Sequence, residues 1–210
     1  MTRFPEAAQP VRGGFVLWDV AERRPLKSIP FQFNPDTLTR TLQPQGAGDE
    51  SGDRLEVLRL KGPPHESYKF DAEFDATDYP DRARDGLLPV LSALEVTMYP
   101  RRTDLLAERT LAEQGAIEIA PLEAPLLVLV LGKKRVMPVR ITEFSVTEDM
   151  FDAALNPVRA KVSVGVRVLT VDDVGYAHKG GELYLGHHRE KEGFASRVIN
   201  PIADVGLTTL

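Results

Sequence analysis

The segment Ile29-Pro-Phe-Gln-Phe-Asn-Pro-Asp-Thr-Leu38 is the most informative part of this sequence. Phe31 and Phe33 lie two residues apart, so a β-strand would place both side chains on one face, and we predict that both belong to the core. Pro35 cannot donate a backbone N–H to a β-ladder, and it biases Asn34 away from helical geometry. We therefore predict that Asn34-Pro35 ends the strand in a fixed structural corner.

Four longer segments carry the periodicity of β-strands. The strictest alternation of apolar and charged residues lies in 66–76, and a second, valine-rich one lies in 158–168; both predict half-buried antiparallel strands. Residues 126–131 are continuously apolar, which predicts a strand covered on both faces. In 136–146 the apolar positions change parity, and a β-bulge near 142–143 would bring both sets to the core.

Shorter extended patterns predict strands at 15–20, 29–33, 37–42 and 55–60. We expect 29–33 and 37–42 to pair with one another around the Asn34-Pro35 corner. The polar, glycine-rich residues that follow, 43–53, are predicted to form a loop.

A helical period interrupts the strands near the middle of the chain. Four apolar residues recur there at helical spacing, namely Leu87, Leu91, Leu94 and Met98. A helix that begins near Gly86 would place Pro89 in its first turn, where proline is tolerated. A second short helix is predicted at 103–114, with Thr103 as its cap and Gly115 as its stop.

The C-terminal segment, 172–210, changes character and is rich in glycine and histidine. We predict a short helix within 184–198. We also expect this segment to lie outside the β-domain and to depend on a partner for order.

Composition excludes several classes of protein. The chain has 210 residues, a formal net charge of −5 and no cysteine, which excludes disulfides, thiolate catalysis and cysteine-ligated zinc. The negative charge argues against nonspecific nucleic-acid binding. Residues 1–14 lack the apolar core of a signal peptide, and the longest apolar run, 126–131, is too short to span a bilayer as a helix. We expect a soluble protein, cytoplasmic at synthesis, with no direct membrane insertion.

One cluster, His187-His188-Arg189-Glu190, has residue types that could bind a metal ion. It would need His178 or Glu182 to complete a ligand set, and Arg189 in its middle disfavours a cation. The sequence also lacks the Gly-x-Ser-x-Gly elbow and the phosphate-binding P-loop. We therefore expect a solvated helix face, no metal, no cofactor and no enzymatic activity.

The order of these patterns resembles the tube proteins of contractile injection systems, the phage-tail-like particles that drive a rigid tube through a membrane. The resemblance is to the baseplate-side tube adaptor in particular, and it covers residues 15–170. It rests on the block Phe31–Pro35, the strand 68–75, the helix bearing Leu87, Leu91 and Leu94, and the strands 126–132, 139–147 and 158–170. The chain departs from many such adaptors because it shows no C-terminal LysM module.

The resemblance implies a mainly β fold with one helical region (α+β), namely an antiparallel β-barrel or sandwich of the tail-tube type with a flanking helix. It implies a flexible N-terminus (1–14), a barrel domain (15–170) with a helical insert at about 81–114, and a C-terminal extension (171–210) for partner contacts. In such proteins the loop at 43–53 reaches the neighbouring layer.

The function implied by the resemblance is structural. The chain would form a hexameric ring at the baseplate end of the inner tube, within an intracellular or released particle. Its partners would be copies of itself, inner-tube subunits, and spike and baseplate proteins. Two alternatives remain open: the main inner-tube subunit, and a ligand-binding β-barrel carrier. The carrier needs interior space, whereas the apolar strands predict a filled core.

Two groups of residues are candidates for contacts between subunits. The first contains the acidic and basic outer faces of two strands: Asp71, Glu73, Asp75, Arg159, Lys161 and Arg167. These charges pair either within one sheet or head-to-tail between subunits of a ring. The second group contains residues of the C-terminal segment that would bind a partner: Tyr184, His187, His188 and Phe194.

Overall fold

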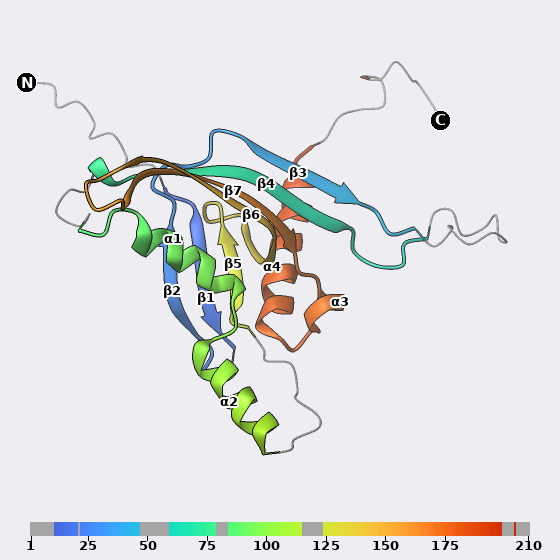
Figure 1. The fold of residues 1–210 in the computed structure, drawn as a ribbon. Coiled ribbons are helices and arrows are strands. Elements are labelled where there is room, and N and C mark those ends of the chain that lie inside the picture. Colours follow the sequence, from blue (N-terminus) through green and yellow to red (C-terminus); the bar gives the residue numbers. More distant parts are fainter. Residues whose placement is uncertain are drawn as a thin grey trace, which may run out of the picture.

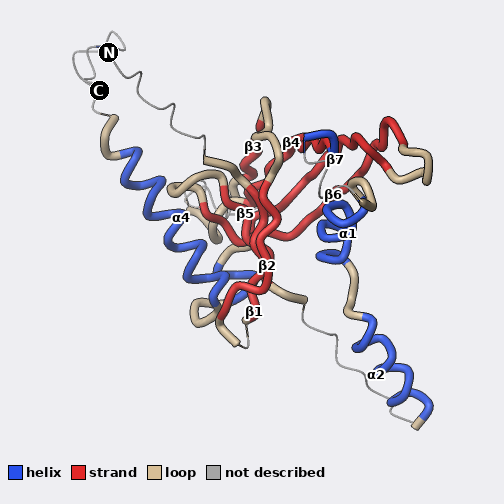
Figure 2. The backbone as a smooth tube through the Cα atoms, turned by 90° about the vertical axis from the view of Figure 1, so that its left-hand side faces the viewer, coloured by secondary structure: helices blue, strands red, loops and turns tan. Residues whose placement is uncertain are grey.

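The computed structural model describes residues 11–20, 22–46, 59–78, 84–114, 124–198 and 204. They form one strongly bent β-sheet with helices packed on both of its sides (Figure 1). Figure 2 shows the strands lying between helix α1 (Leu88–Glu95) and helix α4 (Lys179–Ala195).

The sheet contains seven strands in the order β2-β1-β5-β6-β7-β4-β3, and each neighbouring pair is antiparallel. The strands are β1 (Gly14–Asp19), β2 (Arg24–Pro30), β3 (Leu38–Gln43), β4 (His65–Asp75), β5 (Leu126–Val130), β6 (Val136–Phe151) and β7 (Pro157–Val168). The predicted fold class, mainly antiparallel β with a helical region, is confirmed.

Short helices flank the sheet. Besides α1 and α4 they are η1 (Ala76–Asp78), η3 (Val96–Met98), α2 (Arg102–Glu113) and α3 (Val171–Val174). Helix α1 carries Pro89 in its first turn, as predicted. The predicted cap of α2 is wrong, because the helix begins after Arg101 and Thr103 lies inside its first turn, where its hydroxyl donates to Asp104 Oδ1.

The bend of the sheet brings together strands that are distant in the strand order. Phe15 of β1 and Phe70 of β4 are separated in the sheet by β5, β6 and β7, yet their ring centroids lie 6.2 Å apart. Phe31, just after β2, packs edge-on against both rings, at 5.6 Å from Phe15 and 5.4 Å from Phe70. Leu91 and Leu94 of α1 join this cluster, so the bent sheet encloses a filled core.

The strand patterns are confirmed where they were strictest. In β4 the buried apolar residues alternate with exposed ones, and in β7 the valines of one face are buried. Leu126–Leu129 of β5 are all buried, as expected for a strand with both faces covered. The register of β6 against β7 shifts between Ile141 and Glu143, which is the predicted bulge.

The predicted pairing of 29–33 with 37–42 is wrong. β2 pairs with β1, and β3 pairs with β4. The strand ends at Pro30, so the two-residue alternation does not continue through the corner: Phe31 is 0% exposed, whereas Phe33 is 49% exposed. The prediction that both phenylalanines are core residues therefore holds for Phe31 alone.

Several predicted segments lie wholly or partly outside the described residues. These are most of the N-terminus (1–14), the larger part of the 43–53 loop and of the strand at 55–60, and Gly115. At the margins of the loop, Gly46 and Leu60 form an isolated β-bridge.

We predict that Gly14→Ala destabilises the fold. A Cβ atom at Gly14 would lie 2.6 Å from the Ile29 carbonyl oxygen and 2.7 Å from Pro30 Cα, both of which are backbone atoms of β2. Relieving this contact would require the β1–β2 ladder to move, so we expect a loss of about 1–3 kcal/mol in the free energy of unfolding. Denaturant unfolding followed by circular dichroism measures it.

The matched control is Gly186→Ala inside α4, where a Cβ atom would meet nothing within 4 Å. Alanine is the better helix former, so this variant should gain about 0.5–1 kcal/mol. Equal stability of Gly14→Ala and the wild type would contradict the assigned contact.

Candidate functional site

The charged outer faces of β4 and β7 pair within the chain. The register sets Asp75 opposite Arg159 and Glu73 opposite Lys161. Arg159 Nε donates to Asp75 Oδ2 at 2.7 Å, and Lys161 Nζ lies 2.8 Å from Asp71 Oδ2. The hydrogen bond from Lys161 also holds the pKa of Asp71 below its usual range. The intramolecular alternative is therefore the correct one for these pairs, and at such exposed positions solvent screens their contribution to stability.

The two arginines at the end of this face differ in their partners. Arg140 of β6 lies directly opposite Arg167 of β7. Arg167 forms an ion pair with Asp173 at 2.5 Å, but Arg140 forms no hydrogen bond or ion pair with any described residue. Like charges facing one another across strands are unfavourable, and the carboxylate of Asp173 offsets this repulsion at Arg167. Whether the predicted interface residues also contact a neighbour stays a prediction.

The corner joins three parts of the chain through side-chain amides. Asn34 Oδ1 accepts from the Gly13 N–H at 2.8 Å, and Asn34 Nδ2 donates to the Val11 carbonyl at 3.0 Å. Gln32 Nε2 donates to the Asp75 carbonyl at 2.8 Å, and the Asp75 N–H donates to Gln32 Oε1 at 2.9 Å. The segment entering β1, the exit of β2 and the end of β4 are thus fixed relative to one another.

The outer side of the same corner faces solvent. Phe33, Asn34 and Pro35 line a surface hollow of about 570 Å³ together with Lys69 and Asp71 of β4. The exposed ring of Phe33 therefore lies at the protein surface and is available to a partner.

A buried carboxylate attaches α4 to the sheet. Glu66 of β4 is 3% exposed, and its Oε1 accepts from the Tyr68 hydroxyl at 2.7 Å. Its Oε2 accepts from Lys191 Nζ and lies 3.8 Å from His187 Nε2. Burial opposes the charge of Glu66, but hydrogen bonds from its neighbours outweigh burial and lower its pKa to about 2. Burial, reinforced by the carboxylate, raises the pKa of Tyr68 to about 12.

This attachment corrects the description of the C-terminal segment. Helix α4 is longer than predicted, begins after His178, and packs against β6, so residues 171–195 do not require a partner for order. Tyr184 and His187 are buried in that packing and cannot serve as partner contacts; His188 and Phe194 are exposed. No group of three or more potential ligands that could hold a metal ion occurs among the described residues.

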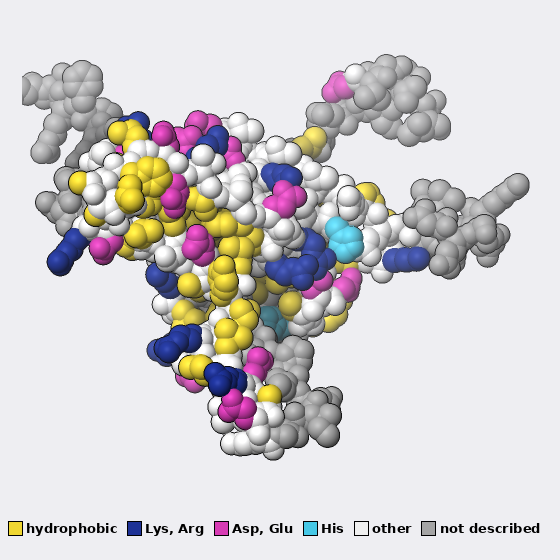
Figure 3. Space-filling view, viewed as in Figure 1, with side chains coloured by type: hydrophobic (Ala, Val, Ile, Leu, Met, Phe, Trp, Pro, Cys, Tyr) yellow, Lys and Arg dark blue, Asp and Glu magenta, His cyan; other side chains and the backbone are white. Residues whose placement is uncertain are grey.

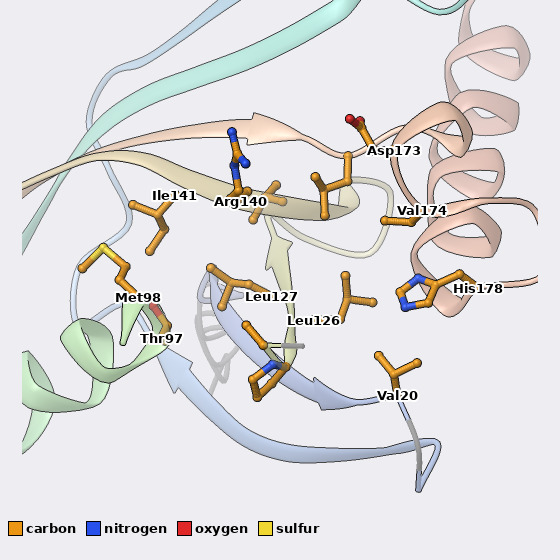
Figure 4. A pocket seen from close by; sticks show the side chains of 14 residues that line it. Val20, Thr97, Met98, Leu126, Leu127, Arg140, Ile141, Asp173, Val174 and His178 are labelled. Atoms are coloured by element: carbon orange, nitrogen blue, oxygen red, sulfur yellow. The ribbon is translucent and has the colours of Figure 1, made fainter. Parts of the chain in front are cut away.

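A hollow of about 580 Å³ opens at one end of the sheet (Figure 4). Its apolar lining comes from four elements: Met98 of η3, Leu126 and Leu127 of β5, Ile141 of β6, and Val174 of α3. The polar lining residues include Arg140, Asp173 and His178. This hollow lies at the beginning of β5, next to the point on β6 beyond which β5 no longer pairs with it.

One four-strand unit of the sheet has, among the described residues, a free edge at one end and a partly free edge at the other. The unit is β6-β7-β4-β3, and β3 is the last strand of the sheet. At the other end, β5 pairs only with 136–139 of β6, so the remainder of β6 has no strand on that side among the described residues. A row of unpaired backbone groups is a template for pairing with another chain.

An apolar stripe runs over α1 and η3 and along α2 (Figure 3). Its large side chains are all at least 41% exposed: Leu88, Val96, Met98, Tyr99, Leu105, Leu106 and Leu111. Helix α2 projects from the body, and none of its residues is buried (Figures 1 and 2). Most helices gain their stability from burying an apolar face, and a helix of twelve residues is marginal without one.

The end of β6 and the turn that joins it to β7 display further apolar side chains. Met150 and Leu155 both have positive φ, 56° and 64°, and Leu155 is 79% exposed. The turn is held by Asp152, whose Oδ1 accepts from the backbone N–H groups of Ala154 and Asn156, both at 2.8 Å. The sequence predicts a turn at 151–157, but sequence reasoning did not identify Met150, Leu155 and the leucines of α2 as exposed. The sequence signal that could have identified these exposed residues is leucine or methionine within a short segment whose other residues are polar.

No family model and no curated protein matches this sequence. Among solved structures, one similar chain belongs to a structure described as "Tail of empty GTA particle computed with helical refinement, C6 symmetry". The identity is 11%, the match covers 75% of this chain and 90% of that chain, and the TM-score is 0.33. Values of this size do not indicate a shared function. No helix among the described residues is both long and apolar enough to cross a bilayer.

The Glu66 cluster predicts a specific pH dependence. The pKa of Glu66 is about 2 in the folded chain against an ordinary value of 4.5. Its ionisation therefore stabilises the fold above pH 4.5, and that contribution is lost as the pH falls from 4.5 towards 2. In Glu66→Gln this contribution is absent, so the stability lost between roughly pH 7 and pH 3 should shrink by about 2 kcal/mol. Urea unfolding at both pH values measures the difference.

Glu113→Gln on the exposed α2 is the matched control, because Glu113 pairs only with Arg109 at the surface. This control should retain the wild-type loss of stability on acidification. If Glu66→Gln retains it as well, Glu66 does not carry the pH dependence.

Proposed function

We propose that this chain is a structural subunit of a phage-tail-like contractile injection particle. It forms a ring, hexameric by the resemblance, at the baseplate end of the inner tube and links the tube to the spike complex. Its partners are copies of itself, inner-tube subunits, and spike and baseplate proteins; we propose no enzymatic role. The observation that carries the proposal is the pair of free edges on the β6-β7-β4-β3 unit.

The backbone groups at the β3 edge can be assigned from the corner. The N–H and C=O of Asp75 bond the Gln32 side chain, so they face away from β7. Backbone direction alternates along a strand, hence Ser67 faces β3, and its partner Thr41 faces back to β4. The next residue, Leu42, therefore directs its N–H to the open edge.

Two different free edges on one chain favour a head-to-tail assembly. Pairing the β6 edge of one copy with the β3 edge of the next leaves a free edge at each end of the pair, and repetition generates a closed ring when the rotation closes. Ring closure would cover the β3 edge and the unpaired part of the β6 edge, which removes a route to aggregation at these two places.

The alternatives differ in what they require of the structure. A carrier needs space inside the bent sheet, but Val162, Val164 and Val166 are at most 2% exposed and fill that interior. The main inner-tube subunit would use the same edges. The region from α3 onwards follows the last strand in the chain and packs against the sheet, and its exposed side favours an adaptor that meets a component other than a tube ring. The exposed His188 and Phe194 are the remaining candidates from that region for such a contact.

We predict that Leu42→Pro abolishes assembly without unfolding the subunit. Proline removes the N–H that faces the open edge and leaves the β3–β4 ladder bonds intact. Purified wild-type protein should show rings with a central hole by negative-stain electron microscopy, and the variant should show single subunits of unchanged circular dichroism.

Leu42→Ala is the control, because it shortens the same side chain but retains the N–H. It should assemble like the wild type. Rings of Leu42→Pro would rule out pairing at the β3 edge, and a wild-type protein that stays monomeric at high concentration would contradict self-assembly.

A further inference from the structure

The open edge of β6 has backbone groups whose direction can be assigned. The N–H and C=O of Asp75 in β4 bond a glutamine side chain and face away from β7. The cross-strand partner Arg159 therefore faces β6, and its own partner in β6, Asp149, faces back to β7. Backbone direction alternates along a strand, so the N–H and C=O of Glu148 point to the open edge, together with those of Val146.

At both free edges these residues direct their side chains to the core side of the sheet. Arg40 of β3 lies opposite Tyr68, which is buried. Val146 of β6 lies opposite Val162, which is also buried, and Glu148 follows two residues later. Residues directly opposite one another point to the same face of a sheet. The two rows with free backbone groups are Leu38, Arg40 and Leu42 in β3 and Phe144, Val146 and Glu148 in β6.

The strand directions limit how these two rows can meet. Each step from β6 to β7, from β7 to β4 and from β4 to β3 reverses the direction, so β3 runs opposite to β6 within one chain. In a ring whose axis runs along the strands, β3 of one copy therefore meets β6 of the next copy in antiparallel orientation. A shift of one residue would turn the core side of one copy to the outer side of the other. The registers that remain differ by steps of two residues.

One charge in each row selects among these registers. Arg40 and Glu148 are the charged members of the two rows, and both are exposed. The Arg40 guanidinium lies beside the Tyr68 hydroxyl, and it forms no ion pair with a carboxylate of a described residue. Glu148 likewise has no ion pair within the described part of the chain. A charge that closes against an apolar side chain loses hydration without compensation, whereas an opposite charge compensates it.

We propose that β3 of one copy pairs with β6 of the next copy in the register that sets Arg40 opposite Glu148. The same register sets Leu42 opposite Val146, so apolar side chains also meet across the junction. In the registers shifted by two residues, both charges face apolar residues instead. This inference rests on the proposed ring, and it adds the residues that determine how two subunits align.

The outer face of this junction gives a direct way to read the register. There the proposed alignment sets Thr41 opposite Thr147, in a pair whose backbone groups do not bond one another. The Cα atoms of such a pair lie about 4.5 Å apart, which is within the range for a disulfide. Ser145 lies on the same face but two residues away, at a diagonal separation of about 7–8 Å, which is too long for an unstrained disulfide.

Disulfide trapping tests the register without background, because the chain contains no cysteine. A chain with Thr41→Cys is co-assembled with an affinity-tagged chain that carries Thr147→Cys, and mixed dimers are measured on non-reducing gels after mild oxidation. Since each chain carries one cysteine, a cross-link between the two positions must join two chains. Ser145→Cys in the tagged chain is the matched control, because both β6 positions are exposed and share one face.

We expect Thr41→Cys to cross-link to Thr147→Cys at least about fivefold more than to Ser145→Cys. Adding Arg40→Glu to the Thr41→Cys chain should abolish the excess, because it places two carboxylates opposite one another. Adding Glu148→Arg to the Thr147→Cys chain should restore it, since the reversed charges attract again. Arg24→Glu on the other edge strand, β2, changes the net charge equally and should leave the cross-link unchanged.

The outcomes separate the register from the proposed function. Rings that cross-link preferentially through Ser145→Cys, equally through both positions, or through neither overturn the register and leave the ring standing. Neither rings nor cross-links at high concentration overturns both proposals. If the reversed charges do not restore the cross-link, the Arg40–Glu148 pair does not set the alignment and the proposal is overturned at that point.

Discussion

The contact of Phe15 with Phe70 sets the shape of this molecule. Joining β1 to β4 across three intervening strands forces the sheet to bend, and Phe31 fills the space between the two rings. The bend gives α1 an interior to cover and leaves the outer side of β6 to α4. It also separates β5 from the far part of β6, which creates both the hollow and one of the free edges.

The surface follows from this geometry. A sheet that bends without closing retains unpaired edges, and no strand among the described residues covers the β3 edge or the part of β6 beyond its pairing with β5. The charges on β4 and β7 are already paired in their own sheet, so the unpaired strand edges and the exposed apolar side chains remain for contacts with other molecules. These are the groups whose burial drives association of proteins.

Local patterns predicted what depends on local geometry. Alternation identified β4 and β7, the parity change identified the bulge at Ile141, and spacing identified α1. The pairing of β3 was predicted wrongly because it depends on Gln32 and Asn34 binding residues far along the chain. Glu66 appeared as one polar residue at a strand end, and only its contact with α4 makes it a buried anchor. The lack of packing on α2 likewise depends on tertiary geometry, which the spacing of apolar residues in the sequence does not predict.

In the region of the turn between β6 and β7, the residue that fixes the backbone conformation differs from the residues that expose apolar side chains. Asp152 holds the turn through its own hydrogen bonds, whereas Met150 and Leu155 contribute exposed side chains that the turn does not need for its shape. Natural variation at those two positions can therefore change what the tip recognises at little expense to folding, although both sites favour residues that tolerate positive φ. Related chains with divergent tips and a retained aspartate would represent one scaffold adapted to different neighbours.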